Sequence, residues 1–243
     1  MGRTFDAVMH MLYPRRCPVC DDAVSPAGAD VCRDCRGVFP ALPEETCAKC
    51  GKPLSARQKD EGYCGDCLRI DHAFDRGFSL FSYRDVAPSV YRFKYKGRQE
   101  YASYYAGRFV KRNKRALGRL SLDALIPVPL AKKKLQKRGY NQAEVFARAL
   151  SGHLRVPVMN DIITRVRDTK PQKELDYYGR RNNLKNAFIM KKNDVEIERV
   201  AIVDDIYTTG STIDEISRLL KEGGIREIYA FTVAIGSDIF EKR

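Results

Sequence analysis

The chain has no long apolar run, and this absence limits where the protein can reside. Its 243 residues are 44% hydrophobic, but the apolar stretches are far shorter than the roughly 20 residues that cross a bilayer as a helix. The N-terminal segment MGRTFDAVMHMLYPRRC has only a brief apolar stretch, interrupted by Asp6 and His10, and it makes a poor secretory signal. We therefore expect a cytoplasmic protein that reaches the inner face of the membrane, if at all, through partners.

Cysteine is absent after residue 67, and all eight cysteines fall in four C-x-x-C pairs. Such a turn directs two thiolates at one ion, and two turns make a tetrahedral four-cysteine zinc site. Consecutive pairing gives two structural zinc ions, one held by Cys17, Cys20, Cys32 and Cys35 and the other by Cys47, Cys50, Cys64 and Cys67. The spacing leaves open an interleaved pairing, of the first pair with the third and the second with the fourth.

Other uses of these cysteines fit the pattern less well. Disulfides require a secretory route, a redox C-x-x-C would not occur four times, and the spacings differ from the clusters of ferredoxins. Because four protein thiolates leave no open coordination position, the predicted sites hold structure and do no chemistry. We predict an N-terminal helix and a small double zinc-ribbon domain over residues 1–70, where bound metal supplies much of the folding free energy.

Acidic residues are outnumbered by basic ones in the remainder of the chain. The net charge is +13, and residues 1–70 hold 10 basic and 10 acidic residues, so residues 71–243 carry the whole excess, 34 against 21. Such a basic body favours polyanionic partners, although a positive surface also serves solubility.

The basic residues that follow residue 91 are interleaved with aromatic ones. Tyr95, Tyr101, Tyr104 and Tyr105 lie among ten Lys and Arg residues between positions 92 and 119. This combination can grip a sugar-phosphate backbone and stack its bases, whereas tyrosines at helical spacing also serve as packing. The candidates for contact with single-stranded DNA, here and in the next lysine run, are Arg92, Lys94, Lys96, Arg98, Lys132, Lys133 and Lys134.

Short apolar runs alternate with helical patterns from residue 74 onward. Strands are expected at residues 78–83, 122–128, 156–164, 200 onward and 228–235, and helices at 86–95 and 100–116. A further helix follows Asn141, which can cap it with Glu144 as its capping-box partner. This alternation predicts an α/β domain with a parallel, doubly wound sheet over residues 74–243.

The run VAIVDDIYTTGST, residues 200–212, points most clearly to a ligand. Its apolar half is typical of a buried parallel strand, and its turn supplies N–H groups, hydroxyls and a helix N-terminus, which favour a phosphate. Asp204 and Asp205 stand at the strand's carboxyl end, where open α/β sheets bind ligands, and carboxylates accept hydrogen bonds from sugar hydroxyls. We infer a phosphorylated sugar, against the plainer reading of an acid pair that caps a helix. Walker and G-x-G-x-x-G spacings are absent, which excludes those nucleotide loops.

A second candidate anion site follows the predicted strand at residues 122–128. A loop rich in lysine and the run RGYNQ, residues 138–142, form this site, unless they are an ordinary basic surface; in a protein that resembles a phosphoribosyltransferase, the loop would face the pyrophosphate. The candidates to line this side of the site are Lys96, Arg138, Asn141, Gln142 and, from a polar segment further along, Gln172.

Residues 200–212 resemble, over their whole length, the 5-phosphoribosyl 1-pyrophosphate (PRPP) loop of type I phosphoribosyltransferases. The resemblance implies that Asp204 and Asp205 hold the ribose 2′ and 3′ hydroxyls. It also implies that the turn wraps the 5′-phosphate, with Tyr207, Thr208, Thr209, Gly210, Ser211 and Thr212 as binding residues, and that magnesium accompanies PRPP.

Several motifs in one order resemble the ComF (competence protein F) family of double-zinc-ribbon, phosphoribosyltransferase-like proteins. They are the cysteine pairs, YKGR at residues 95–98, RGYNQA, TKPQKELDYYGRRNNLKNAF and the PRPP-like loop. The resemblance covers nearly the whole chain. It implies a type I phosphoribosyltransferase-like domain in a protein that helps to bring single-stranded DNA inside during natural transformation, beside a competence helicase.

Whether the chain catalyses a reaction is left open by its sequence. A transferase would direct a nucleobase at the anomeric carbon of PRPP while magnesium-bound pyrophosphate leaves. However, the cysteine-rich head takes the place of a base-recognising hood, and no residues specify a base. We therefore weigh a DNA-handling protein that binds PRPP against an active phosphoribosyltransferase with an unknown nucleobase-like acceptor, and against a scaffold with a vestigial loop.

Overall fold

A four-stranded parallel sheet forms the centre of the computed structural model, which describes residues 14–26, 28–167, 179, 184, 186–191 and 196–237. The strand order is β1-β6-β5-β2, with every neighbouring pair parallel. These strands are β1 (Arg76–Ser82), β2 (Ala124–Pro127), β5 (Arg199–Tyr207) and β6 (Glu227–Ile235). A separate antiparallel pair consists of β3 (Ile163–Arg165) and β4 (Phe188–Met190). The predicted parallel α/β architecture is confirmed.

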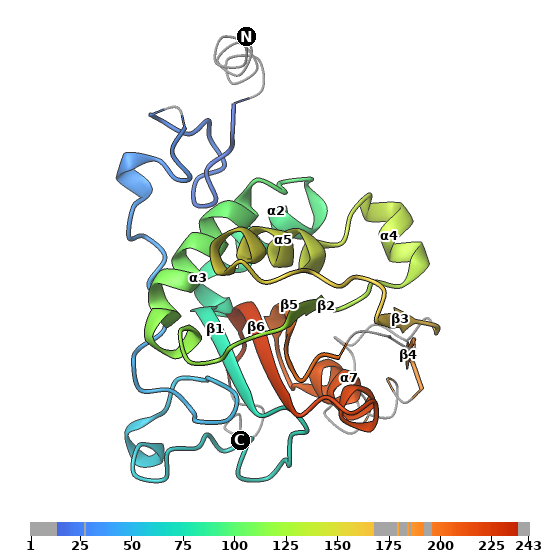
Figure 1. The fold of residues 1–243 in the computed structure, drawn as a ribbon. Helices are drawn as coiled ribbons and strands as arrows, with labels where there is room; N and C mark the ends of the chain where they lie inside the picture. The colour runs from blue at the N-terminus through green and yellow to red at the C-terminus, as the bar shows by residue number, and fades with distance from the viewer. Residues whose placement is uncertain are drawn as a thin grey trace.

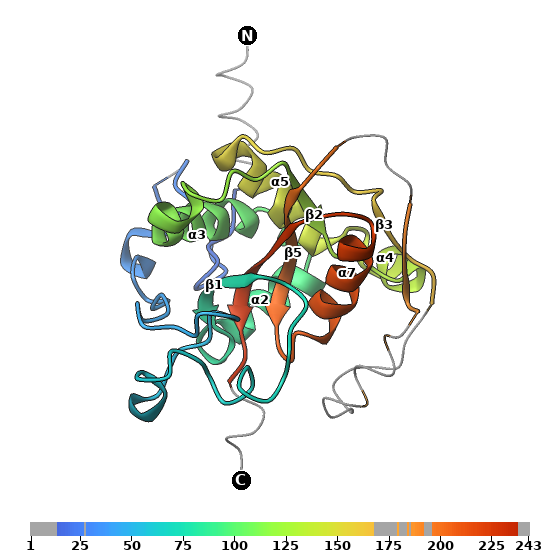
Figure 2. The same ribbon diagram turned by 60° about the horizontal axis from the view of Figure 1, so that its bottom comes forward.

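Helices cover both faces of the sheet (Figures 1 and 2). The helices are α2 (Tyr83–Tyr95), α3 (Tyr101–Leu117), α4 (Lys132–Arg138), α5 (Gln142–Leu154) and α7 (Ser211–Glu222), with short 3₁₀ turns η1 (Arg33–Cys35) and η2 (Ala56–Gln58). Within β5, Ala201 and Val203 pack in the same cluster as Phe146 of α5, whereas Val200 and Ile202 pack with α7. Because both faces are buried, the strand is apolar without alternation.

The first cysteine-rich segment, residues 17–35, and the second, residues 47–67, lie at different places on this core. Figure 1 shows the first, in dark blue, beside α2 and α3, and the second, in cyan, near the start of β1 on the other side of the sheet. The second segment approaches β1 closely: Gly51 has φ +79°, and a Cβ there would lie 2.8 Å from the carbonyl oxygen of Gly77. Only glycine fits both the conformation and the space. The N-terminal helix predicted ahead of residue 14 lies outside the described residues.

Three local predictions are wrong. The stretch 156–164 does not add a strand to the main sheet: Val158 makes one isolated bridge to Leu125, and β3 begins only at Ile163, because Pro157 and the polar residues before β3 interrupt the apolar pattern. Tyr83 opens helix α2 and is not part of a strand. The expected lysine-rich loop is helix α4, since Lys, Leu, Gln and Arg are all good helix formers.

Candidate functional site

A large cavity opens at the carboxyl end of β5. Its volume is about 880 Å³, within the range of small-molecule sites. It is bounded by α2, by α4 and by the turn from β5 into α7. The lining residues are Tyr83, Val90, Tyr91, Lys94, Tyr95, Lys134, Lys137, Arg138 and the continuous run from Asp204 to Ile213. The acids and hydroxyl-rich turn predicted from residues 204–212 therefore all line one cavity.

The two acids at the end of β5 differ in their surroundings. The Asp205 carboxylate is buried and forms an ion pair with Lys94 of α2, with 2.5 Å between Oδ2 and Nζ. Asp204 accepts a hydrogen bond from the N–H of Asp205 at 2.8 Å. Burial raises the pKa of Asp204 to about 6, although the positive charges of Lys94, Arg165 and Arg138 oppose that rise. Asp205 is thus paired with a cation, whereas burial opposes the ionisation of Asp204.

The turn after β5 lines the cavity and leads directly into α7. Gly210 precedes α7 with φ +76°, and a Cβ there would lie 2.5 Å from the Tyr207 hydroxyl oxygen. Thr209 and Ser211 share a hydroxyl–hydroxyl hydrogen bond of 2.7 Å. The first N–H groups of a helix have no partner inside it and carry partial positive charge. The turn and the start of α7 can therefore receive an anion.

A buried polar chain supports this turn from behind. His72 Nδ1–H donates to the Asp214 carboxylate at 2.8 Å, and the Tyr207 hydroxyl donates to His72 Nε2 at 3.2 Å. The N–H of Ala73 also donates to Asp214 at 3.0 Å. His72 stands a few residues after the second cysteine-rich segment. Its hydrogen bonds to Asp214 and Tyr207 therefore connect that segment with the turn between β5 and α7. Sequence reasoning missed this link because the partners are about 140 residues apart in the chain.

The RGYNQ motif, residues 138–142, supplies one residue that lines the cavity, and other side chains of the motif hold the neighbouring helices in place. Arg138 lines the cavity and donates to the Gln142 side-chain oxygen. Tyr140 is buried and donates to the Phe93 carbonyl oxygen of α2. Asn141 caps α5 by accepting from the Ala143 N–H at 3.1 Å, as predicted. Gln142 and Asn141 thus hold α4 and α5 in place without being among the described lining residues.

Two other sequence expectations at this motif have different outcomes. Glu144 does not complete a capping box, because its carboxylate accepts from Arg148 at 2.7 Å and from Asn160 at 3.0 Å. Gln172 lies outside the described residues.

Tyr83 and Tyr91, which were not predicted from the sequence, also line the cavity. Tyr91 is four residues before Tyr95, and residues four apart share a helix face. This spacing was the available signal.

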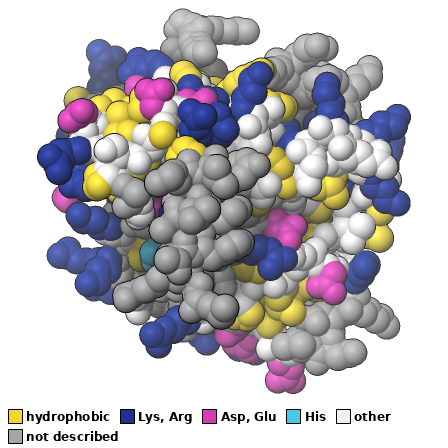
Figure 3. Space-filling model, turned by 90° about the horizontal axis from the view of Figure 1, so that it is seen from above, with side chains coloured by type: hydrophobic (Ala, Val, Ile, Leu, Met, Phe, Trp, Pro, Cys, Tyr) yellow, Lys and Arg dark blue, Asp and Glu magenta, His cyan; other side chains and the backbone are white. Residues whose placement is uncertain are grey.

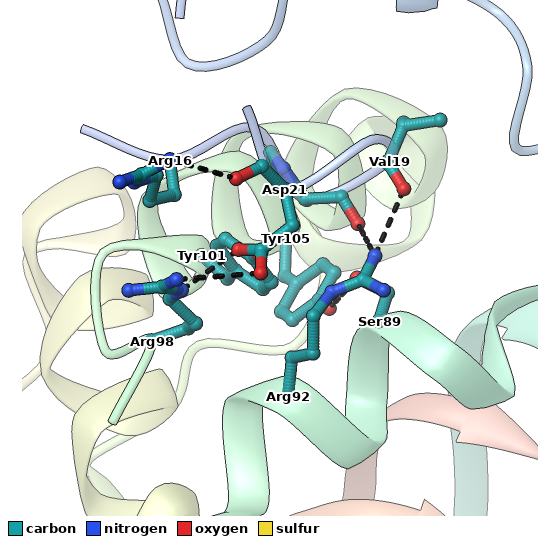
Figure 4. A network of polar contacts seen from close by, with 9 residues as sticks. Arg16, Val19, Asp21, Ser89, Arg92, Arg98, Tyr101 and Tyr105 are labelled. Carbon is teal, nitrogen blue, oxygen red and sulfur yellow. Dashed lines mark hydrogen bonds and ion pairs between the residues drawn. The ribbon is translucent and has the colours of Figure 1, made fainter. Parts of the chain in front are cut away.

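Several nucleic-acid candidates have structural contacts instead of an open surface. Arg92 donates to the carbonyl oxygens of Val19 at 2.8 Å and Pro18 at 3.3 Å. Arg98 pairs with Asp21 at 2.7 Å, which also accepts from the Tyr101 hydroxyl at 2.6 Å. Burial opposes ionisation of Asp21, but the Arg98 and Tyr101 bonds hold its pKa below the ordinary value. Figure 4 shows this network fastening the first cysteine-rich segment to α2 and α3.

The remaining candidates divide between cavity and surface. Lys94 and Lys134 line the cavity, while Lys96, Lys132 and Lys133 are exposed. Figure 3 shows Lys and Arg side chains spread widely over one face of the molecule. Of the tyrosines proposed for stacking, Tyr101, Tyr104 and Tyr105 are buried in the core, so only Tyr95 of that set can meet a base.

Each half of the cysteine set converges on one point. The sulfur atoms of Cys17, Cys20, Cys32 and Cys35 lie within 4.8 Å of one another, and so do those of Cys47, Cys50, Cys64 and Cys67. A zinc ion bound to four thiolates at about 2.3 Å sets the sulfurs roughly 3.8 Å apart, and the Cys50 and Cys64 sulfurs are 3.5 Å apart. The residues therefore fit two zinc ions, and consecutive pairing is confirmed.

The two cysteine groups differ in burial. Cys47, Cys50 and Cys64 are buried in the same cluster as Val200 of β5. Lys52 and Asp66 form a buried ion pair beside them, and Lys52 also donates to the Ser237 carbonyl oxygen at 3.3 Å. In the first group Cys20 is exposed and only Cys17 is buried. The second group is thus part of the domain core, and the first is an attachment on its surface.

Comparison with protein families identifies both parts of the chain. The double zinc ribbon domain matches residues 8–68, and the phosphoribosyl transferase domain matches residues 141–238. The structure thus combines a zinc-ribbon region with a phosphoribosyltransferase-like α/β domain. Among the described residues, every helix is too short or too polar to cross a membrane.

Similar curated proteins cover most of the chain. Competence protein F of Haemophilus influenzae is 35% identical over 90% of this chain and 96% of its own length. DNA utilization protein YhgH of Escherichia coli K12 is 32% identical over 73% of this chain and 78% of its own. Competence protein ComFC of Bacillus subtilis is 26% identical over 84% of this chain and 83% of its own.

Proposed function

Because this chain belongs to the competence protein F family, we propose that it assists the uptake or use of single-stranded DNA and binds PRPP or a similar sugar phosphate. The family relationship rests on a relative 35% identical over 90% of the chain. Names of the relatives refer to competence and to DNA utilization. The protein acts in the cytoplasm, where single-stranded DNA arrives during transformation and where a competence helicase is a suitable partner.

One observation carries the ligand proposal: the adjacent acids and the anion-receiving turn line the same cavity. Carboxylates suit sugar hydroxyls, which donate hydrogen bonds, and they repel phosphates. The turn before α7 suits a phosphate, because N–H groups and a helix N-terminus converge there. A ligand with vicinal hydroxyls beside a phosphate satisfies both, and phosphorylated ribose has this arrangement.

A pyrophosphate on the same ligand has basic neighbours across the cavity. Lys134, Lys137 and Arg138 of α4 line the same cavity as the turn, and cations attract phosphate oxygens. Magnesium would enter with the diphosphate, since it is commonly held by phosphates and one or two carboxylates.

A titration of PRPP and magnesium into the protein tests this site. The double variant Asp204→Asn/Asp205→Asn keeps side-chain shape but adds donors where the sugar hydroxyls need acceptors, so affinity should fall at least about a hundredfold. The matched control is Asp60→Asn/Glu61→Gln, which makes the same charge change on exposed residues of the second ribbon. Equal affinity for both variants would refute the sugar contacts.

Phosphoribosyl transfer remains a second candidate because the cavity continues past the turn onto α2 and α4. That space can hold an acceptor beside the anomeric carbon. Incubation with PRPP, magnesium and a panel of nucleobases, followed by a pyrophosphate assay, separates the two functions. Release that depends on one base would establish a transferase, and its absence with intact PRPP binding supports the DNA-handling protein.

A further inference from the structure

The part of the cavity beyond the sugar-phosphate turn is aromatic and basic. Three tyrosines of α2 line it together with basic residues of α4. They are Tyr83, Tyr91 and Tyr95, of which Tyr91 and Tyr95 share one face of the helix because they are four residues apart. A phosphorylated sugar needs hydroxyl acceptors and anion donors, and it does not need an aromatic wall.

Tyr91 and Tyr95 stand out by their exposure. Their side chains are 53% and 55% exposed, whereas Tyr101 and Tyr105 of the next helix are fully buried. The two rings lie 5.1 Å apart between centroids and are tilted by 46°. Single exposed aromatic residues are common, but an adjacent pair lining a cavity is a surface that a flat ligand can cover.

The cationic wall is held against these rings. The Arg138 guanidinium lies 4.7 Å from the centroid of Tyr95, within the range of cation–π contacts. Gln142 accepts from Arg138, and Tyr140 fastens the end of α4 to the Phe93 carbonyl oxygen of α2. The aromatic pair and its cation are thus preorganised, which lowers the entropy cost of binding.

We propose that Tyr91 and Tyr95, with Arg138, form a stacking site for the nucleobase of a phosphate-bearing nucleotide, next to the sugar-phosphate turn. Base–aromatic stacking tolerates any sequence, because every base has a π-face. The proposal deepens the proposed function and rests on it, since it places DNA bases in the cavity that holds the sugar phosphate.

Comparing a 12-nucleotide thymidine oligomer with an abasic oligomer of equal length and charge isolates the stacking contribution. The wild type should bind the thymidine oligomer at least about fivefold more tightly. The variant Tyr91→Ala/Tyr95→Ala should lose this preference while keeping the same salt dependence, because phosphate contacts are unchanged. Tyr91→Phe/Tyr95→Phe should retain it, since the rings remain.

The matched control is Tyr63→Ala, which removes another exposed tyrosine, 43% exposed, from the second cysteine-rich segment. It should behave as the wild type, and circular dichroism with zinc analysis should show that each variant is folded. If Tyr91→Ala/Tyr95→Ala keeps the full preference for bases over abasic sites, the stacking site is refuted.

Two further measurements distinguish a free nucleotide from DNA as the ligand, and the stacking site from the sugar-phosphate site. Thymidine 5′-monophosphate is added as a competitor of the oligomer. Displacement at a similar concentration would identify a free nucleotide as the ligand, and no displacement would identify a DNA strand. Asp204→Asn/Asp205→Asn should lose PRPP binding but keep the preference for the thymidine oligomer over the abasic one, because both rings are unchanged. A wild type that fails to bind PRPP but prefers bases would refute the sugar-phosphate ligand and leave the stacking site standing.

Discussion

Asp204 and Asp205 are neighbours in sequence but have unequal electrostatic surroundings. Lys94 balances the charge of Asp205 at 2.5 Å, whereas burial raises the pKa of Asp204 to about 6. A ligand that brings hydrogen-bond donors or a cation to Asp204 therefore stabilises its ionised form. The site stores an electrostatic cost that binding relieves, which is common where charged residues serve function instead of stability.

We predict that Asp204→Asn stabilises the folded protein while it weakens sugar-phosphate binding. The pKa of Asp204 rises from 3.8 to about 6 on folding, so its ionisation opposes folding. That opposition is absent below about pH 4, increases through about pH 6 and is complete above it. The variant should gain on the order of 1–3 kcal/mol of unfolding free energy at pH 7.5 and about half as much at pH 5.

Urea unfolding of both proteins at the two pH values, with zinc present, measures this difference. Asp60→Asn, on the exposed ribbon surface, is the control and should change the unfolding free energy little at either pH. A loss of stability in Asp204→Asn that is equal at pH 5 and pH 7.5 would show that Asp204 acts through its shape and not its charge.

Helix α2 performs three tasks with three sets of residues. Arg92 holds the first cysteine-rich segment, Lys94 pairs with Asp205, and Tyr91 and Tyr95 line the cavity. Adjacent residues on a helix point about 100° apart, so a single helix can present these groups to different neighbours. The basic and aromatic residues that suggested a nucleic-acid surface therefore have different structural roles.

Arg92→Ala should loosen the first cysteine-rich segment and leave the sheet intact. The side chain donates to the Pro18 and Val19 carbonyl oxygens, which lose these partners in the variant. Hydrogen exchange should speed up at least about tenfold over residues 17–36 while β5 and β6 remain protected. The control is Arg84→Ala, whose side chain is 92% exposed. Equal exchange in both variants would show that Arg92 does not hold the segment.

The sheet was predictable because the central parts of its strands are largely apolar. Residues 200–203, 230, 231 and 233–235 are buried hydrophobic residues, so hydrophobicity locates these strands, and the order of helical patterns implies parallel pairing. The four C-x-x-C pairs were predictable for a different reason, because metal geometry demands that spacing. In both cases one local requirement decides the structure.

The rest depends on contacts distant in sequence. Nothing near Lys94 indicates that its partner is Asp205, and nothing near His72 indicates Asp214. Tyr101 and Tyr95 look alike in sequence, but α3 lies on the sheet and buries the first, whereas α2 leaves the second exposed. Tertiary packing decides which polar and aromatic residues reach the cavity.

On the scale of the whole molecule, the two zinc sites should differ in metal retention. The first group has an exposed cysteine and two half-buried ones, and the second has three buried cysteines within the core cluster of β5 and α7. A chelator should therefore release zinc in two phases of about one ion each, and only the slower should coincide with loss of the fold. Chelator absorbance recorded together with circular dichroism measures both.

The variant Cys20→Ser/Cys35→Ser assigns these phases, because it removes ligands from the first group alone. It should lack the fast phase and keep the slow one. Release of both ions in a single step that coincides with unfolding would contradict two independent sites.

Under the two proposals, a sugar phosphate and single-stranded DNA occupy neighbouring parts of one cavity. The most direct test is a titration of PRPP with and without saturating thymidine oligomer, and the reverse titration of the oligomer with and without PRPP. We predict that each ligand changes the affinity of the other, and by the same factor, because linkage is reciprocal. Affinities that are unchanged in both directions would contradict the account.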